Sequence, residues 1–188
     1  MAASIVQLNP DEVVSEFQAE DGTHVTVRTV REQDLYDCLH FINSLVDEDA
    51  PILVDRRSTI QEELVWLNGR LEALAHDDSV VLVAEVSGRV VGVVEVRRHV
   101  FREQHVGTVA IGLLKDYRDV GIGTGLMSAA MQRAKDAGFR LLVLESFSSN
   151  RRAIHVYEKL GFQKAGEVPG KVSYQDGYVS SVMMFKEL

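Results

Sequence analysis

Cysteine is almost missing from this sequence of 188 residues, since Cys38 is the only one. A single cysteine excludes an intramolecular disulfide, and this usage is compatible with a reducing cytoplasm. Cys38 falls at helical spacing with apolar neighbours, so we interpret it as a small core residue rather than a nucleophile. Those neighbours are Leu35, Leu39, Ile42 and Leu45.

Long apolar segments are missing as well. The longest runs are about seven residues, whereas a helix that crosses a bilayer needs ~20. The N-terminus carries no basic flank followed by an apolar run, so no secretory signal is expected. We therefore expect a cytoplasmic protein with no membrane partner.

Positive charge is in the minority, with 20 Lys and Arg against 28 Asp and Glu and a net charge of −8. Such a chain repels a polyphosphate backbone, which argues against a nucleic-acid partner and favours a cationic one. The six histidines are scattered without the spacing of metal ligands, so no metal site is expected.

What the sequence does contain is an alternation of strand and helix patterns without a linker or repeat. The expected strands cover residues 24–29, 80–86, 90–98, 107–114 and 140–147. The expected helices cover residues 34–46, 60–74, 126–134 and 151–160. A last hairpin is expected from two further strands, over residues 168–174 and 178–186. The order is β-α-α-β-β-β-α-β-α-β, typical of an α/β (α+β) domain with a central, mostly antiparallel mixed sheet flanked by helices. We assign residues 24–188 to this single domain and residues 1–23 to an N-terminal extension. Ser58 and Gln61 are interpreted as the capping box of the second helix.

A turn with three glycines, Arg-Asp-Val-Gly-Ile-Gly-Thr-Gly over residues 118–125, connects a strand to a helix. Glycines allow a sharp turn, and the unpaired N–H groups of the following helix attract a phosphate or pyrophosphate. A purely structural role of the glycines is about as common. The Walker A pattern is excluded because Leu126 and Met127 follow the last glycine, and the spacing differs from a dinucleotide fingerprint.

Two linked motifs resemble those of the GCN5-related N-acetyltransferase (GNAT) superfamily. Arg118-x-x-Gly121-x-Gly123 resembles the Arg/Gln-x-x-Gly-x-Gly/Ala signature of that superfamily. The segment from Asn150 to Phe162, with Ala153, Tyr157 and Gly161 at matching positions, is similar to its Asn-x-x-Ala-x-x-x-Tyr-x-x-x-Gly-Phe segment. The resemblance covers roughly residues 24–186 and implies an acetyltransferase fold with acetyl-CoA as co-substrate.

The resemblance also implies roles for individual residues. The backbone amides of the glycine turn would hold the CoA pyrophosphate, with a charge-assisted contact from Arg118, and the strand end would hydrogen-bond the pantetheine arm. Asn150 would help to hold the cofactor near its thioester, Tyr157 would protonate the departing thiolate, and Glu145, twelve residues before Tyr157, would act as general base. The implied backbone contacts come from Leu113, Leu114, Val120, Gly121, Gly123, Thr124 and Gly125.

Two positions depart from the family pattern. Other members carry a catalytic acid on the strand before the glycine turn, where this chain has Thr108. The turn also carries Asp119, whose negative charge works against phosphate binding.

Simpler interpretations remain open for three of the residues. Tyr157 could be a core aromatic, Glu145 a member of a structural ion pair, and Asn150 the cap of the helix that begins at Arg151.

We expect acetyl transfer to a primary amine, with a small molecule, an amino acid or a polyamine favoured by resemblance of the C-terminal segment. The alternatives are a protein N-terminal acetyltransferase, as the spacing of Glu145 and Tyr157 suggests, and a non-catalytic acyl-CoA-binding domain. Dimers are common in the family, so a homodimer is compatible with the resemblance.

Overall fold

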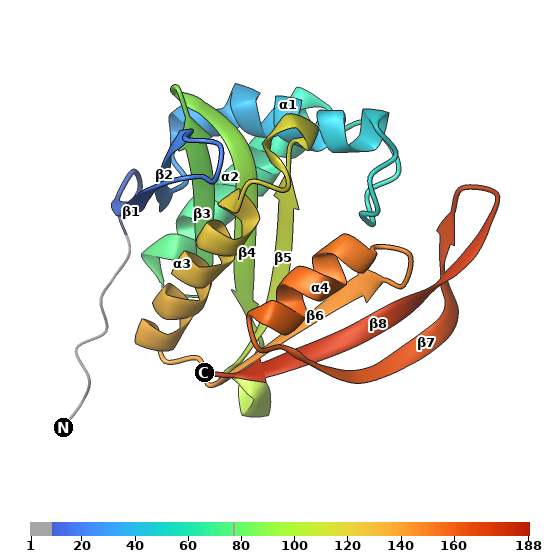
Figure 1. Cartoon of the computed structure of the whole chain (residues 1–188). Coiled ribbons are helices and arrows are strands. Elements are labelled where there is room, and N and C mark those ends of the chain that lie inside the picture. The colour runs from blue at the N-terminus through green and yellow to red at the C-terminus, as the bar shows by residue number, and fades with distance from the viewer. Residues whose placement is uncertain (1–8, 77) are drawn as a thin grey trace.

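The computed structural model describes residues 9–76 and 78–188. One eight-stranded sheet carries helices on both faces (Figure 1). The strands are β1 (Val13–Gln18), β2 (His24–Thr29), β3 (Ser79–Val86), β4 (Arg89–Arg98), β5 (Val106–Leu113), β6 (Leu141–Phe147), β7 (Gln163–Tyr174) and β8 (Gly177–Glu187). The helices are α1 (Leu35–Asp47), α2 (Ile60–Ala75), α3 (Ile122–Asp136) and α4 (Arg151–Lys159).

The strand order is β1-β2-β3-β4-β5-β6-β8-β7, and only the pair of β5 and β6 is parallel. The expected mixed, mostly antiparallel sheet is confirmed. Figure 1 shows α3 and α4 on the face nearer the viewer. The opposite face of β5 meets α1, because a Cβ at Gly112 would lie 3.0 Å from both Leu45 and Phe41.

The core is centred on β3 and β4, whose residues are buried on both faces of the sheet. Such continuous apolar runs are expected for strands that are covered by helices on either side. Cys38 on α1 is 1% exposed, and burial raises the pKa of its thiol. The interpretation of Cys38 as a core residue is therefore confirmed.

Three boundaries differ from the expectation. β1 pairs along β2, so residues 13–18 of the proposed N-terminal extension belong to the sheet, while residues 1–8 lie outside the described part. The capping box of α2 is formed by Thr59 and Glu62, not by Ser58 and Gln61, because the two reciprocal side-chain bonds join this pair. β7 begins at Gln163, five residues earlier than its apolar pattern indicated, since almost all of its side chains are exposed.

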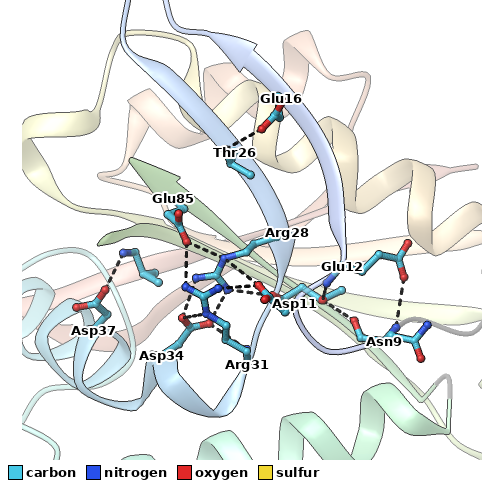
Figure 2. A network of polar contacts seen from close by, with 12 residues as sticks. Asn9, Asp11, Glu12, Glu16, Thr26, Arg28, Arg31, Asp34, Asp37 and Glu85 are labelled. Atoms are coloured by element: carbon cyan, nitrogen blue, oxygen red, sulfur yellow. Dashed lines mark hydrogen bonds and ion pairs between the residues drawn. The ribbon is translucent and has the colours of Figure 1, made fainter. Parts of the chain in front are cut away.

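A buried network of ion pairs ties β2 to α1 and β3 (Figure 2). Arg28 is 3% exposed, and its two terminal nitrogens each donate to a carboxylate oxygen of Asp34 at 2.7 Å. Its Nε donates to Glu85 at 2.8 Å. Burial alone would lower the pKa of Arg28, but the hydrogen bonds to Asp34 and Glu85 outweigh burial and raise it. Arg28 therefore stays charged inside the fold, and together with Arg31 it offsets the charges of Asp34 and Glu85.

Candidate functional site

The sheet splits between β5 and β6. These strands pair only over three positions, from Val106 with Leu141 to Thr108 with Val143. β5 continues beyond this point along β4 as far as Leu113, whereas β6 continues along β8. Figure 1 shows the two strands starting together and diverging towards their ends. The side of β5 that faces the split therefore has no partner strand beyond Thr108.

The two leucines at the end of β5, to which the resemblance assigned contacts with the pantetheine arm, direct their backbone groups to opposite sides of the strand. The N–H of Leu114 donates to the carbonyl of Val91 at 2.8 Å, and the carbonyl of Leu114 accepts from Tyr117 at 3.0 Å. Because backbone groups alternate along an antiparallel strand, those of Leu113 point away from β4, into the split. The N–H of Leu113 is thus placed to meet a ligand there, whereas its carbonyl accepts from Arg118 at 2.9 Å and both backbone groups of Leu114 already have partners.

The glycine turn lies at the open end of the split. Gly121 precedes α3 with φ of 88°, in the left-handed region that glycine adopts without strain. Gly123 and Gly125 serve close packing instead, since an added Cβ would lie 2.8 Å from Leu113 and 2.4 Å from Phe17. The structural interpretation of the glycines is therefore confirmed, and their role in phosphate binding stays a prediction.

The first turn of α3 has unused hydrogen-bond donors. No side chain caps this helix, and its first turn contains no acidic residue. Within the described part of the chain, the N–H groups of residues 120–124 have no hydrogen-bond acceptor. The implied contacts of Val120, Gly121, Gly123 and Thr124 are available at a helix N-terminus that attracts anions. The N–H of Gly125, in contrast, donates to the carbonyl of Gly121 at 3.0 Å.

The charged side chains around the turn are paired with one another. Arg118 donates through Nε to the carbonyl of Leu113 at 2.9 Å and through a terminal nitrogen to Glu48. It therefore braces the end of β5, and a phosphate contact from Arg118 stays a prediction. Asp119 forms an ion pair with Arg152 of α4, with 3.3 Å between Oδ1 and Nε. Arg152 thus offsets the negative charge that the sequence placed in the turn.

Replacing Thr124 with proline is expected to weaken CoA binding by roughly 10- to 100-fold. Proline is tolerated in the first helical turn, but it removes the free N–H of Thr124, and a hydrogen bond to a charged group contributes about 1.5–3 kcal/mol. Titration of CoA followed by calorimetry measures the loss. Thr124→Ala keeps the N–H and should bind as the wild type does; equal binding by both variants would show that this amide does not hold the phosphates.

Glu145 lies on β6 and projects on the sheet face opposite to the buried Leu144. Its Oε2 accepts hydrogen bonds from Lys171 of β7 and from Ser181 of β8, the latter at 2.7 Å. The hydrogen bond from Lys171, followed by that from Ser181, lowers the pKa of Glu145. The ion-pair interpretation is thus realised, and a role of Glu145 as base stays a prediction. Lys171 belongs to the C-terminal segment that carries the resemblance to small-molecule acetyltransferases. Neither Lys171 nor Ser181 was expected to contact Glu145, because the pairing of β6 with β8 and of β8 with β7 is long-range.

Tyr157 lies in the core, as its simpler interpretation requires. It is 8% exposed and its ring lies 6.0 Å from that of Phe162, centroid to centroid. Burial raises the pKa of the phenol to about 12, so the hydroxyl is protonated at neutral pH. Within the described part of the chain this hydroxyl has no hydrogen-bond partner. A protonated phenol without a partner is able to donate to a ligand atom.

Asn150 caps α4, because its side-chain oxygen accepts from the N–H of Ala153 at 3.2 Å. The capping interpretation is confirmed, and the implied contact with the cofactor stays a prediction. Capping uses the oxygen of the side chain and leaves its NH₂ group without a partner in the described chain.

Thr108, which stands where other family members carry a catalytic acid, is part of a polar triad with His99 and Glu103. The hydroxyl of Thr108 lies 2.7 Å from Nε2 of His99, and Nδ1 of His99 lies 2.7 Å from a carboxylate oxygen of Glu103. This triad was not expected from the sequence, where the six histidines are scattered without metal-ligand spacing. The signal was the turn between β4 and β5, which brings residues 99 and 108 together.

No helix in the described residues is long and apolar enough to span a membrane. A search of the same residues for three or more metal-ligating side chains in one place found no such group.

Known proteins with similar sequences are acetyltransferases or acyltransferases. The sequence model of the Acetyltransferase (GNAT) family matches residues 39–162. An N-alpha-acetyltransferase of Sulfurisphaera tokodaii is 35% identical over 106 residues, which are 50% of this chain and 62% of that protein. The L-amino acid N-acyltransferase MnaT of Escherichia coli is 24% identical over 147 residues, 77% of this chain and 83% of that protein. Several curated relatives, including the first of these two, are matched over less than two thirds of their own length.

Solved structures share the fold. The structure of yncA, a putative acetyltransferase from Salmonella typhimurium with its cofactor acetyl-CoA, superimposes with a TM-score of 0.78 at 22% identity. The superposition covers 87% of this chain and 94% of that one. Since the family model also spans more than half of the sequence, the chain belongs to the acetyltransferase (GNAT) family.

Proposed function

We propose that this protein is an acetyl-CoA-dependent N-acetyltransferase that acts on the primary amine of a small molecule by direct attack in a ternary complex. The observation that carries the proposal is the split between β5 and β6 with the uncapped N-terminus of α3 at its open end. The split offers unpaired strand groups to an extended amide chain, and the helix offers free N–H groups to a pyrophosphate. Acetyl-CoA combines these two features in one molecule.

The acceptor that we propose is an amino acid or a similar small amine. Glu145 and Lys171 place a carboxylate and an ammonium side by side on the open face of the sheet, each more than two-fifths exposed. An amino acid carries the two complementary charges, so its ammonium could replace Lys171 on Glu145 while its carboxylate meets Lys171. The likeness to MnaT, named as an L-amino acid N-acyltransferase, supports this choice.

A contact across the acceptor face supports a small acceptor over a peptide. The hydroxyl of Tyr174, near the turn of the β7–β8 hairpin, donates to the carbonyl of Asp49 in the α1–α2 loop at 2.7 Å. Gln175 donates to the carboxylate of Asp49 at 3.2 Å. The ring of Tyr174 also meets Phe147 edge-on, with centroids 5.2 Å apart. These contacts join the two segments over the site and narrow the path that a peptide would follow.

The chemistry assigns separate tasks to the two predicted catalytic residues. We propose that Tyr157 donates its proton to the sulfur of the departing thiolate, since burial keeps the phenol protonated. We propose that Glu145 receives the ammonium of the acceptor. Its lowered pKa favours the charged form, which binds a cation, and makes it a weaker proton acceptor.

A screen for thiol release from acetyl-CoA tests the acceptor class. Free amino acids should be acetylated faster than simple alkylamines, and both faster than peptides that begin with Ala or Ser. Faster acetylation of peptide N-termini would favour the alternative of a protein N-terminal acetyltransferase, for which the likeness to the Sulfurisphaera tokodaii protein speaks. Binding of acetyl-CoA without turnover on any amine would favour a non-catalytic acyl-CoA-binding domain.

Two variants examine the charged pair in the same assay. Lys171→Met should raise KM for an amino acid and lower KM for a simple amine, because Lys171 attracts a carboxylate but competes with an ammonium for Glu145. Glu145→Gln should raise KM for both acceptors with little change in kcat. A loss of kcat that recovers at high pH would instead identify Glu145 as the base.

A further inference from the structure

The split in the sheet begins at Thr108. This residue forms the last β5–β6 pair, with Val143, so its side chain lies where the two strands part. Residues 108, 110 and 112 share one face of β5, the face that α1 meets at Gly112. On that face Thr108 is half-buried and Ala110 is exposed, so α1 leaves the vertex of the split open. Glu145, two residues beyond Val143 on β6, projects on the same face.

The hydrogen bonds of His99 determine which of its nitrogens can accept a proton. A carboxylate can only accept hydrogen bonds, so the 2.7 Å contact with Glu103 places the proton of the neutral ring on Nδ1. Nε2 then carries a lone pair and accepts the hydroxyl proton of Thr108 at 2.7 Å. The oxygen of Thr108 is in turn free to accept a proton from a third group.

The turn that carries Glu103 is held in a strained shape. Phe101 has φ of 57°, a left-handed conformation that is strained for a residue with a bulky side chain. Its side chain is 85% exposed, so packing of the ring does not account for this conformation. Arg98 fixes the same turn by donating to the carbonyl of Gln104 and, across to α3, to that of Ala137, both at 2.7 Å. The strained turn reverses the chain direction and brings the carboxylate of Glu103 within 2.7 Å of the His99 ring.

We infer that Glu103, His99 and Thr108 form a proton relay that removes the proton of the acceptor amine. The inference rests on the proposed acetyl transfer. It assigns a general base to the reaction although Thr108 replaces the catalytic acid that other family members carry on this strand. The acceptor first gives up its ammonium proton to water. As the nitrogen of the neutral amine then bonds to the thioester carbonyl carbon, an N–H proton passes to the oxygen of Thr108, and the hydroxyl proton of Thr108 passes to Nε2 of His99. Glu103 stabilises the resulting imidazolium.

The remaining steps balance the protons. The C–S bond breaks with its electron pair on sulfur, and the thiolate takes the proton of Tyr157. His99 then releases its proton to water, and the phenolate of Tyr157 takes one back. Thr108 is the catalytic residue of the relay because it touches the amine, whereas His99 and Glu103 act through it. The charged groups on the face of the relay include Glu103 from the turn, Arg97 across from Thr108 on β4, and Glu145 on β6. On the same face, Glu95 of β4 forms ion pairs with Arg97 and with Arg70 of α2.

Steady-state kinetics of thiol release tests the relay on the full chain, with the best amine from the acceptor screen. His99→Gln and Thr108→Val should each lower kcat by about 10²-fold or more, the usual contribution of general base catalysis, with KM for acetyl-CoA within twofold of the wild type. Glu103→Gln should lower kcat by a smaller factor. Thr108→Ser keeps the hydroxyl and should restore most of the activity.

The pH dependence separates a relay from a structural role. For the wild type, log kcat/KM should fall at acidic pH with one unit of slope from protonation of the amine and a second from protonation of His99. The second unit should vanish in His99→Gln and persist in the control His105→Gln, an exposed histidine of the same turn. Melting temperatures with and without CoA show whether each variant folds and binds.

Three outcomes would overturn the relay. If the wild type turns over and the variants keep its kcat and its pH profile, the relay is wrong while the proposed function stands. An acetylated Thr108, found by mass spectrometry after incubation with acetyl-CoA alone, would make Thr108 a nucleophile instead. If the wild type binds CoA but acetylates no amine, the relay and the proposed function are wrong together.

Discussion

Replacing Arg28 with methionine is expected to lower the free energy of unfolding by about 3–5 kcal/mol, because it breaks a buried ion pair and leaves the Asp34 side chain with the longer ion pair from Arg31, at 3.4 Å. Asp34 is as buried as Arg28, at 3% exposure, and loses both of its 2.7 Å bonds from the guanidinium. For a chain of this length such a loss corresponds to a fall of roughly 6–20 °C in Tm. Urea unfolding followed by circular dichroism measures it directly.

Arg56→Met is the matched control for this experiment. Arg56 also forms two bonds to one carboxylate, that of Glu62, but its side chain is 70% exposed and that of Glu62 44%. Ion pairs in contact with solvent contribute only about 0–1 kcal/mol. Equal losses in the two variants would show that burial does not set the strength of the Arg28 network.

Replacing Tyr157 with phenylalanine is expected to lower kcat by ~10²–10⁴-fold while acetyl-CoA binds nearly as before. The variant loses the proton that the thiolate takes up as it leaves, and it keeps the ring that packs near Phe162. Its stability should not fall, because the hydroxyl has no hydrogen-bond partner within the described chain that would be left unpaired. Thiol-release kinetics and thermal unfolding of the same preparation measure both quantities.

Tyr178→Phe removes the same hydroxyl from a ring that is 79% exposed, and it should keep wild-type turnover. If Tyr157→Phe also keeps the wild-type kcat, Tyr157 is a core aromatic and another group protonates the thiolate.

The elements that the sequence predicted well are those whose patterns are local. The strand over residues 24–29 has the bounds expected from its alternation, α1 is displaced by one residue, and β6 begins one residue later than expected and ends where expected. β1 was missed because this short edge strand has alternation too weak to separate it from a loop. β7 was shortened because its exposed residues carry no apolar pattern. In both strands, pairing with a neighbour rather than local sequence determines the structure.

The candidate site was predictable where it depends on contiguous residues. The glycine turn, the uncapped helix behind it and the cap formed by Asn150 all follow from short segments. The partners of the charged groups were not predictable, because Lys171 meets Glu145 only through two strand pairings, and Arg118 meets Glu48 across 70 residues. These partners change the expected chemistry, since Lys171 lowers the pKa of the carboxylate that was expected to act as a base.

Release of CoA thiol from acetyl-CoA, with and without a primary amine, measures whether this protein transfers acetyl groups to amines. We expect thiol release that depends on the amine, saturates with both substrates and yields the N-acetylated amine in equal amount by mass spectrometry. Thr124→Pro should shift the acetyl-CoA saturation to higher concentrations, because it removes an N–H group that we propose as a ligand of the CoA pyrophosphate. No amine-dependent release across amino acids, alkylamines and peptides, from protein that binds CoA, would contradict the account.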